Sequence, residues 1–438
     1  MCDKNGPAPQ PPLAFHVIPT SLVSIRPIMP SFTGEDIPDL DGQVIIVTGG
    51  NAGLGLETVK QLSSHNAARI YLAARSQDKA EQAIRELQAA DPKANTIVFL
   101  RLDLASLESV KDAASYFLHK ETRLDILVNN AGIMMTPEGL TKDGYEIQFG
   151  TNVVGPALFT QYLLPIMRET AKINHQTRMV MLSSAAHVWA PSDIYKISEF
   201  RTKMTNRGTT ERYTISKLAD LHYAKALAER ERHVKIVPVH PGIVATNLHH
   251  ASEGLLLRPF LHIAVRLFAT PVEKGALSQI WAAVSPNAKS GQYYGPIGKA
   301  ESGSKASQNR DLQEQLYEYI QTELEPRLLL MFVCGLALDD NDENIDDDMS
   351  REMNVMRNMA AARHVLQRPY ISGLDVQDAF ASHAKASSLT PNERSHQSNM
   401  FMAGTNLPDA FVDGTDTFTG GSAPEFVCHV SYEARQPR

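Results

Sequence analysis

Three features are scarce in this sequence of 438 residues, and each shortage excludes a class of protein. The three cysteines, Cys2, Cys334 and Cys428, are too few and too far apart for a disulfide framework or a metal cluster. Such usage is typical of a reducing compartment, so we expect a cytoplasmic protein. A net charge of -7 gives no basic surface of the kind that binds nucleic acid.

Long apolar runs are the third shortage. The longest, residues 328–338, has 11 residues, whereas a membrane span needs about 20. The apolar stretch of residues 254–268 is interrupted by Arg258 and Arg266, which favours an amphipathic helix over a membrane span. Any membrane contact is therefore expected to be peripheral at most. The first 40 residues lack the basic and apolar regions of a signal peptide and instead hold repeated prolines, which predicts an extended arm.

Between residue 43 and about residue 296, apolar β-branched runs alternate with helix-like segments. The expected strands cover residues 43–49, 68–75, 95–104, 124–132, 177–184, 234–242 and, more weakly, 291–296. The expected helices cover residues 54–65, 78–90, 106–120, 143–170, 211–231 and 271–284. This alternation predicts an α/β fold, a doubly wound parallel seven-stranded sheet (a Rossmann fold) with helices on both faces.

Composition divides the chain into three parts. Residues 1–40 are the Pro-rich arm, residues 41–325 the compact domain, and residues 326–438 a C-terminal extension. A helix over residues 309–325 is expected to close the compact part. The extension begins with the acidic run Asp339–Asp348. Its later part shows no clear periodicity of apolar residues, so we expect the extension to be poorly ordered.

A glycine-rich turn follows the first expected strand. "TGGNAGLG" places Gly49, Gly53 and Gly55, with Asn51 and Leu54 between them, where a strand passes into a helix. Glycine permits tight turns and close backbone approach, and the N–H groups at a helix N-terminus bind phosphate. The turn therefore predicts a nucleotide site rather than a merely structural turn.

The second expected strand ends in Arg75, which lies 20 residues after Gly55. In the NAD-binding version of this motif an acidic residue near this point holds the ribose 2′-hydroxyl, whereas an arginine accommodates a 2′-phosphate. The segment around Arg75, "YLAARSQ", contains no acidic residue. NADP(H) is therefore the expected cofactor, and a solvent-exposed strand end is the alternative reading of Arg75.

Tyr213 lies four residues before Lys217 in "ERYTISKLAD". Residues at this spacing are neighbours on a helix, so the ammonium can approach the phenol and make it a better acid. The spacing is common by chance and is weak evidence when it is taken alone.

Together these motifs resemble the short-chain dehydrogenase/reductase family, and within it the retinol-dehydrogenase-like branch with its fungal secondary-metabolite members. The motifs keep the family order over residues 41 to about 325. They are "TGGNAGLG", "RLDLAS", "NNAG", "TNVVG", "MLSSAAH", "YTISK" and "HPGIVATNL".

The resemblance implies general acid–base catalysis beside a nicotinamide. Tyr213 would transfer the proton, and Lys217 would make it a better acid and hold the ribose hydroxyls. Ser184 would orient the carbonyl oxygen, with Ser183 as the rival serine. Asn152 would anchor a water that passes protons to Lys217, and a structural capping role is its alternative.

The resemblance also implies further cofactor contacts. Asp103 would meet the adenine ring, and Val244 and Thr246 would lie against the nicotinamide carboxamide. The other expected contacts are Asn130, Ala131, Gly132, Pro241 and Gly242. Paired subunits are common in the family, which leaves a homodimer open. No metal site is expected, since His249 and His250 have no ligand partner at a recognisable spacing.

The expected substrate is a small apolar carbonyl or alcohol compound, with polyketide-like, retinoid-like and steroid-like molecules all open. Residues 247–270 follow Thr246, where the family carries a lid, and are rich in apolar side chains; helical core packing explains them equally well. Ser184 lies 29 residues before Tyr213, which predicts an insertion that shapes the pocket, and Trp189 is either pocket lining or ordinary packing. A non-catalytic NADP-binding scaffold or redox sensor, recruiting a partner through its tail, is the alternative function.

Overall fold

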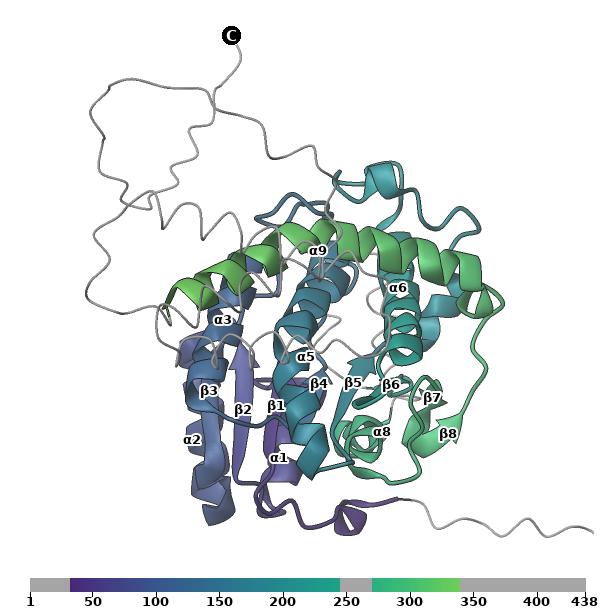
Figure 1. The fold of residues 1–438 in the computed structure, drawn as a ribbon. Helices are drawn as coiled ribbons and strands as arrows, with labels where there is room; N and C mark the ends of the chain where they lie inside the picture. Colours follow the sequence, from purple (N-terminus) through teal and green to yellow (C-terminus); the bar gives the residue numbers. More distant parts are fainter. Residues whose placement is uncertain (1–31, 245–269, 339–438) are drawn as a thin grey trace, which may run out of the picture. The chain divides into compact units, whose positions relative to one another are not determined.

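The computed structural model describes residues 32–244 and 270–338, with side chains up to residue 328. Its centre is a sheet with the strand order β3-β2-β1-β4-β5-β6-β7-β8 (Figure 1). The strands are β1 Val44–Thr48, β2 Arg69–Ala74, β3 Ile97–Arg101, β4 Ile126–Asn129, β5 Arg178–Leu182, β6 Lys235–Val239, β7 Tyr294–Gly295 and β8 Lys299–Ala300.

The predicted α/β fold with seven parallel strands is confirmed. Every pairing from β3 through β7 is parallel, and strand order reverses beside β1, which pairs with both β2 and β4. An eighth strand, not predicted, pairs antiparallel with β7. Only the three-residue turn Pro296–Gly298 joins β7 to β8, and so short a connection permits a hairpin but no crossover.

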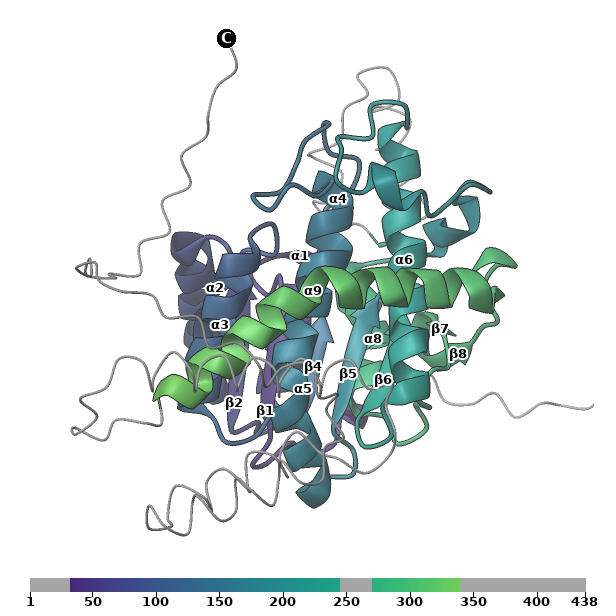
Figure 2. The same ribbon diagram turned by 45° about the horizontal axis from the view of Figure 1, so that its top comes forward.

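Helices cover both faces of the sheet (Figure 2). In β1, Val44 and Ile46 join the core under α3, α5, α6 and α9, whereas Ile45 and Val47 join the core under α1, α2 and α8. Successive strand side chains point to opposite faces, which explains why the strands read as continuous apolar runs. The helices are α1 Gly53–Ser63, α2 Gln77–Ala90, α3 Leu107–Lys120, α4 Ile147–Phe149, α5 Gly155–Ile173, α6 Thr209–Arg230, α8 Val272–Val284 and α9 Arg310–Leu338.

The helical segment predicted over residues 143–170 runs from residue 147 to residue 173 and contains a π-helical turn that was not predicted. The single turn α4 passes into a π-helical turn, η3 Gly150–Val154, before α5 begins. Pro156 has no N–H to donate to the carbonyl of Asn152, four residues earlier, so the regular hydrogen-bond ladder is interrupted here. The interruption places Asn152 in a widened turn.

The last described helix extends beyond the predicted end of the compact part. α9 crosses the outer side of α5 and α6 and continues past residue 325 (Figures 1 and 2). Arg327 forms an ion pair with Asp143 at 2.7 Å. None of the helices within residues 32–244 and 270–338 has the length and hydropathy to cross a membrane.

Part of the predicted N-terminal arm packs onto the domain. Ile37 and Leu40 are buried, and the Leu40 N–H donates to the carbonyl of His65 at 2.8 Å. Residues 1–31 and 339–438 lie outside the described residues, so the three-part division of the chain stays a prediction.

A buried carboxylate ties the amino ends of the central strands together. Asp125 immediately precedes β4 and is fully buried. It accepts hydrogen bonds from the Val44 N–H at 2.9 Å, from the Arg123 guanidinium at 2.6 and 2.9 Å, and from the Asn174 amide at 2.7 Å. One side chain therefore links β1, β4 and the end of α5.

We predict that Asp125→Ala lowers the free energy of unfolding by about 3–5 kcal/mol, because it leaves a guanidinium and an N–H group without their buried acceptor. Urea denaturation measures the loss. The control is Glu108→Ala, since Glu108 forms a solvent-exposed pair with Lys111 and its removal costs at most about 1 kcal/mol. Equal losses in the two variants would contradict this account of the strand ends.

Candidate active site

The glycine-rich turn lies at the carboxyl end of β1, as the sequence predicts. Gly49 and Gly53 have φ values of +67° and +55°, which favour glycine. At Gly55 a Cβ atom would lie 2.3 Å from the carbonyl oxygen of Gly49 and 2.5 Å from the amide nitrogen of Asn130. The first turn of α1 thus packs directly on the strand end, and its N–H groups face the space above β1.

Asn130 fastens this turn to the end of β4. Its side-chain amide donates to the carbonyl of Thr48 at 2.8 Å and accepts from Gln279 of α8 at 3.1 Å. The Thr48 hydroxyl accepts from the N–H groups of Asn130 and Ala131 at 3.0 and 2.9 Å. The side chain of Asn130, predicted as a cofactor contact, therefore shapes the turn from within the protein.

Arg75 and Asp103 follow β2 and β3, so both lie at the same sheet edge as the glycine turn. Arg75 is exposed. The Asp103 carboxylate accepts from the Ala105 N–H at 3.1 Å, and the Asp103 N–H donates to the Ser109 hydroxyl at 3.0 Å, which fixes the loop before α3. The structure thus brings together the side chains that the sequence assigned to one end of a dinucleotide.

Tyr213 and Lys217 lie one turn apart on α6, and both are buried. The Lys217 ammonium donates to the carbonyl of Leu182, the last residue of β5, at 2.9 Å and to Asp220 Oδ2 at 2.7 Å. Burial opposes the charge of Lys217, but the negative charges of Asp220 and of ionised Tyr213 outweigh burial and raise the lysine pKa. Lys217 is therefore held in its charged form.

The π-helical turn brings Asn152 to the same place. Its Oδ1 accepts from the Ile133 N–H at 2.8 Å, and its amide nitrogen donates to the Ile133 carbonyl and to Ser216 Oγ, both at 2.9 Å. A Cβ atom on Gly132 would lie 3.3 Å from Asn152 Oδ1 and 3.5 Å from Lys217 Nζ. The ends of β4, η3 and α6 thus meet around the ammonium.

The two adjacent serines have different surroundings. Ser183 is buried, and its hydroxyl donates to the carbonyl of Lys217 at 2.6 Å. Ser184 is partly exposed at the start of η4 Ala185–Trp189, and its oxygen accepts from the Ala186 N–H at 3.1 Å. Because accepting leaves the Ser184 hydroxyl hydrogen available, this geometry favours Ser184 over Ser183 as the serine that can meet a ligand.

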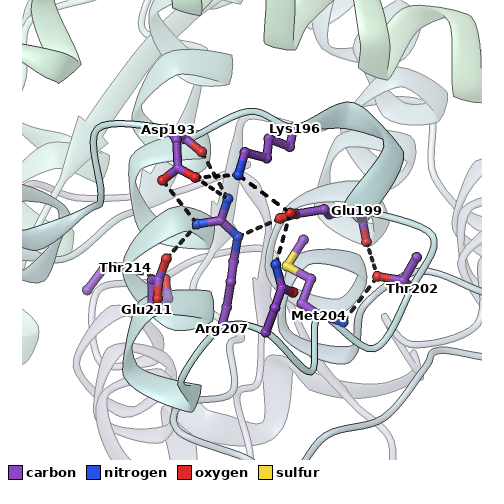
Figure 3. A network of polar contacts seen from close by, with 9 residues as sticks. Asp193, Lys196, Glu199, Thr202, Met204, Arg207, Glu211 and Thr214 are labelled. Atoms are coloured by element: carbon purple, nitrogen blue, oxygen red, sulfur yellow. Dashed lines mark hydrogen bonds and ion pairs between the residues drawn. The ribbon is translucent and has the colours of Figure 1, made fainter.

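The segment between Ser184 and Tyr213 is held by Arg207 (Figure 3). This buried guanidinium bonds Glu199 and Glu211, each at 2.5 Å, and Asp193 at 3.2 Å. Burial lowers its pKa, but the three carboxylates more than reverse that effect, and the pKa of Arg207 is raised. Hydrogen bonds from Lys196 and Arg207 lower the pKa of Asp193 to about 2.

A cavity of about 570 Å³ lies beside this insertion, at the N-terminus of α6. Its lining does not include Ser184, Tyr213 or Lys217. The cavity is therefore next to the cluster formed by these three residues, not at it. Its lining residues are Thr136, Glu138, Thr205, Asn206, Arg207, Gly208, Thr209 and Arg212.

The segment after β6 closes the other side of the site. Gly242, after Pro241, has a φ of +81°. Val244 forms a parallel bridge with Thr270 and packs on α8, where a Cβ atom on Gly275 would lie only 2.6 Å from its side chain. Thr246 and residues 247–269 of the predicted lid lie outside the described residues.

Two histidines near the site are occupied by internal contacts. His187 bonds the carbonyl of Ser184 at 2.8 Å, and its burial lowers its pKa. His240 contacts Glu301 at 3.1 Å and accepts from the Gly242 N–H at 3.2 Å. Both histidines support the loops around the site.

Sequence reasoning missed two residues of the site. Asp220 contacts Lys217 directly, and its place three residues later on the same helix was a readable signal. Arg207 lies four residues before Glu211, but its other two partners, Asp193 and Glu199, come close to it only in the folded insertion.

Several known proteins are similar to this chain over most of its described part. The family model "short chain dehydrogenase" matches residues 43–254. A short-chain dehydrogenase/reductase of Armillaria gallica is 39% identical over 309 residues, covering 69% of this chain and 96% of that protein. Retinol dehydrogenase 14 of Mus musculus is 34% identical over 292 residues, covering 62% and 83%. The solved structure of an uncharacterized protein from Mycobacterium paratuberculosis has a TM-score of 0.52 at 26% identity, covering 67% and 97%.

We predict that Gly55→Ala weakens dinucleotide binding about tenfold or more, because the added methyl group meets the backbone carbonyl of Gly49 and forces the turn apart. Fluorescence titration with NADPH and NADH measures the affinity. Gly208→Ala is the matched control, since a Cβ atom there has nothing within 4 Å. Unchanged affinity in a folded Gly55→Ala protein would contradict the role of the turn.

Proposed function

Because the chain belongs to the short-chain dehydrogenase/reductase family, in its retinol-dehydrogenase-like branch, we propose that it is an NADP(H)-dependent enzyme that interconverts a carbonyl and an alcohol on an apolar substrate. Family membership establishes an oxidoreductase with an NAD(P)-binding fold. The phosphorylated cofactor, the substrate and the residue roles are proposals. The observation that carries them is that a charged Lys217 is bound to the carboxyl end of β5, two residues before Ser184, with Tyr213 one helical turn away on α6.

The residues present fit a dinucleotide. At Gly49 and Gly55 an added Cβ atom would meet the protein's own atoms, so the turn packs tightly on the strand end, and the α1 N-terminus supplies N–H donors for a pyrophosphate. Gly132 lies beside Lys217, and Pro241, Gly242 and Val244 follow the carboxyl end of β6. Two protons of the Lys217 ammonium are used by Leu182 and Asp220, so the third is available for a ribose hydroxyl.

The protein's own part in the reaction is proton transfer and orientation. When bound, the nicotinamide supplies or accepts the hydride. Tyr213 donates its hydroxyl proton to the carbonyl oxygen during reduction and removes that proton during oxidation. Ser184 donates a hydrogen bond to the same oxygen, and the positive charge of Lys217 favours the phenolate form of Tyr213.

Asn152 takes part through its main chain. Its side-chain amide is occupied by Ile133 and Ser216, which matches the structural alternative for this residue. The water that was assigned to Asn152 would therefore be held by its backbone carbonyl in the π-helical turn. Such a water would pass protons to Lys217 and so replace the proton that Tyr213 gives up.

Tyr213→Phe keeps the ring and deletes the proton. We predict that turnover falls at least about a hundredfold while NADPH binding is kept, because general acid–base catalysis alone contributes this much. NADPH oxidation is followed with aldehydes, ketones and polyketide-like compounds, which identifies the substrate class with the wild-type protein. The control is Tyr116→Phe, an exposed tyrosine on α3. Near-native turnover of Tyr213→Phe would instead mean that another group transfers the proton.

Preference for NADP(H) is proposed from Arg75. Its guanidinium is exposed beside the glycine turn, at the end of β2, where a 2′-phosphate of a bound cofactor would lie. A charged hydrogen bond of this kind contributes about 1.5–3 kcal/mol, or about tenfold to a hundredfold in affinity. No acidic residue stands at this point to hold a ribose diol.

Arg75→Asp is therefore expected to lower the preference for NADPH over NADH by about tenfold or more, measured as the ratio of kcat/KM values or of binding constants. The control is Arg85→Asp, which makes the same charge change on the exposed face of α2. It tests whether a charge change elsewhere on the surface also alters the preference for NADPH. An unchanged ratio in Arg75→Asp would remove the argument for the phosphorylated cofactor.

An apolar substrate is proposed from the rim of the site. Val188 and Trp189, in the turn that begins at Ser184, are 50% and 73% exposed, and Ile243 beside Gly242 is 65% exposed. Large exposed apolar side chains gathered near a site are typical of a surface that meets an apolar ligand. A retinoid, steroid or polyketide would suit this rim, and a role in secondary metabolism is proposed from the resemblance to fungal members of this branch.

A further inference from the structure

Asp220 is an incompletely paired carboxylate beside the lysine of the site. It lies on α6 with 1% of its surface exposed. Its Oδ2 accepts from Lys217 Nζ at 2.7 Å. Its Oδ1 has no hydrogen-bond partner among the described residues.

The other buried carboxylates of the fold are satisfied much better. Asp125 accepts four hydrogen bonds from three residues. Glu231, at the end of α6, accepts from Arg168 and from the N–H groups of His233 and Val234. A carboxylate that serves only to hold elements together is normally saturated in this way, because an unmade buried hydrogen bond is costly. Asp220 serves a different purpose.

The surroundings of Asp220 contain few compensating charges. Among the described residues, the titratable groups that face it are Lys217, on its own helix, and Tyr195, from the segment before η5 Ile197–Glu199. The Tyr195 hydroxyl is already bonded to His222 at 2.8 Å. Burial therefore raises the pKa of Asp220 to about 7, although Lys217 opposes this shift.

We propose that Asp220 is a positioning residue that acts through Lys217, holding the ammonium against the end of β5 and offsetting part of its charge on Tyr213. The inference rests on the proposed function, since it takes Tyr213 as the proton-transferring group. With Asp220 ionised, part of the effect of the ammonium on Tyr213 is offset. With the carboxylate removed, the uncompensated ammonium favours the phenolate more strongly.

The test is an ultraviolet titration of tyrosinate absorbance, which needs neither substrate nor turnover. Subtracting the curve of Tyr213→Phe isolates Tyr213 from the other tyrosines of a chain that has 13. Asp220→Asn keeps the shape of the side chain and deletes its charge. We expect its Tyr213 midpoint to fall by about one pH unit relative to the wild type.

Two controls separate charge from shape and stability. Asp220→Glu keeps the charge and is expected to keep the wild-type midpoint. Glu231→Gln weakens another buried pair of α6, far along the helix from Tyr213, and should lower stability without moving the midpoint. If Asp220→Asn does not fold, Asp220→Ser is the second uncharged variant. An unchanged or higher midpoint in a folded, uncharged variant overturns the proposal.

Measurements of turnover separate a failure of this inference from a failure of the proposed function. If the wild type oxidises NADPH and Tyr213→Phe does not, an unmoved midpoint in Asp220→Asn defeats only the role of Asp220. If the wild type shows no turnover, the proposed function fails, while the titration still decides whether Asp220 controls the charge near Tyr213. In an active enzyme the acidic limb of the alcohol-oxidation profile should shift to lower pH in Asp220→Asn.

Discussion

The site depends on one buried ammonium. Lys217 joins α6 to the end of β5 through the carbonyl of Leu182, and its charge is held by Asp220. Ser183 secures the same junction from the opposite direction, because its hydroxyl bonds the carbonyl of Lys217. These contacts fix the position of α6 relative to the end of β5. They therefore also fix the position of Tyr213, which lies one helical turn before Lys217. A charge held so firmly in a buried position acts on its neighbours much more strongly than one in water.

The rest of the fold brings binding residues to the same edge. Parallel strands with helical crossovers place the glycine turn, Arg75, Asp103 and the Pro241–Gly242 segment at one end of the sheet. Ligands of such folds bind at the point where the strand order reverses, which here lies beside β1 and β4. The Asp125 network lies at the amino ends of the strands. It holds the strands together without contributing to the site.

The sequence predicted the elements that have a clear local pattern. The buried parallel strands appear as apolar runs, and the motifs placed Tyr213, Lys217 and the glycine turn where the structure has them. The π-helical turn before α5 was missed because helical periodicity continues through Asn152, although Pro156 was a visible warning. The roles of Ser183 and Asn130 depend on burial and on partners far away in the chain, and neither can be read from spacing. The contact of Asp220 with Lys217 follows from their spacing on α6, but the burial of Asp220 does not.

The central claim is that a dinucleotide lies along the carboxyl ends of β1, β4 and β5, with its reactive ring facing Tyr213. A crystal structure of the complex with NADPH tests it most directly. The account predicts the Lys217 ammonium within hydrogen-bond distance, about 3 Å, of a nicotinamide ribose hydroxyl, with the Tyr213 hydroxyl directed toward the ring. A bound cofactor whose nicotinamide lies away from both side chains would contradict it.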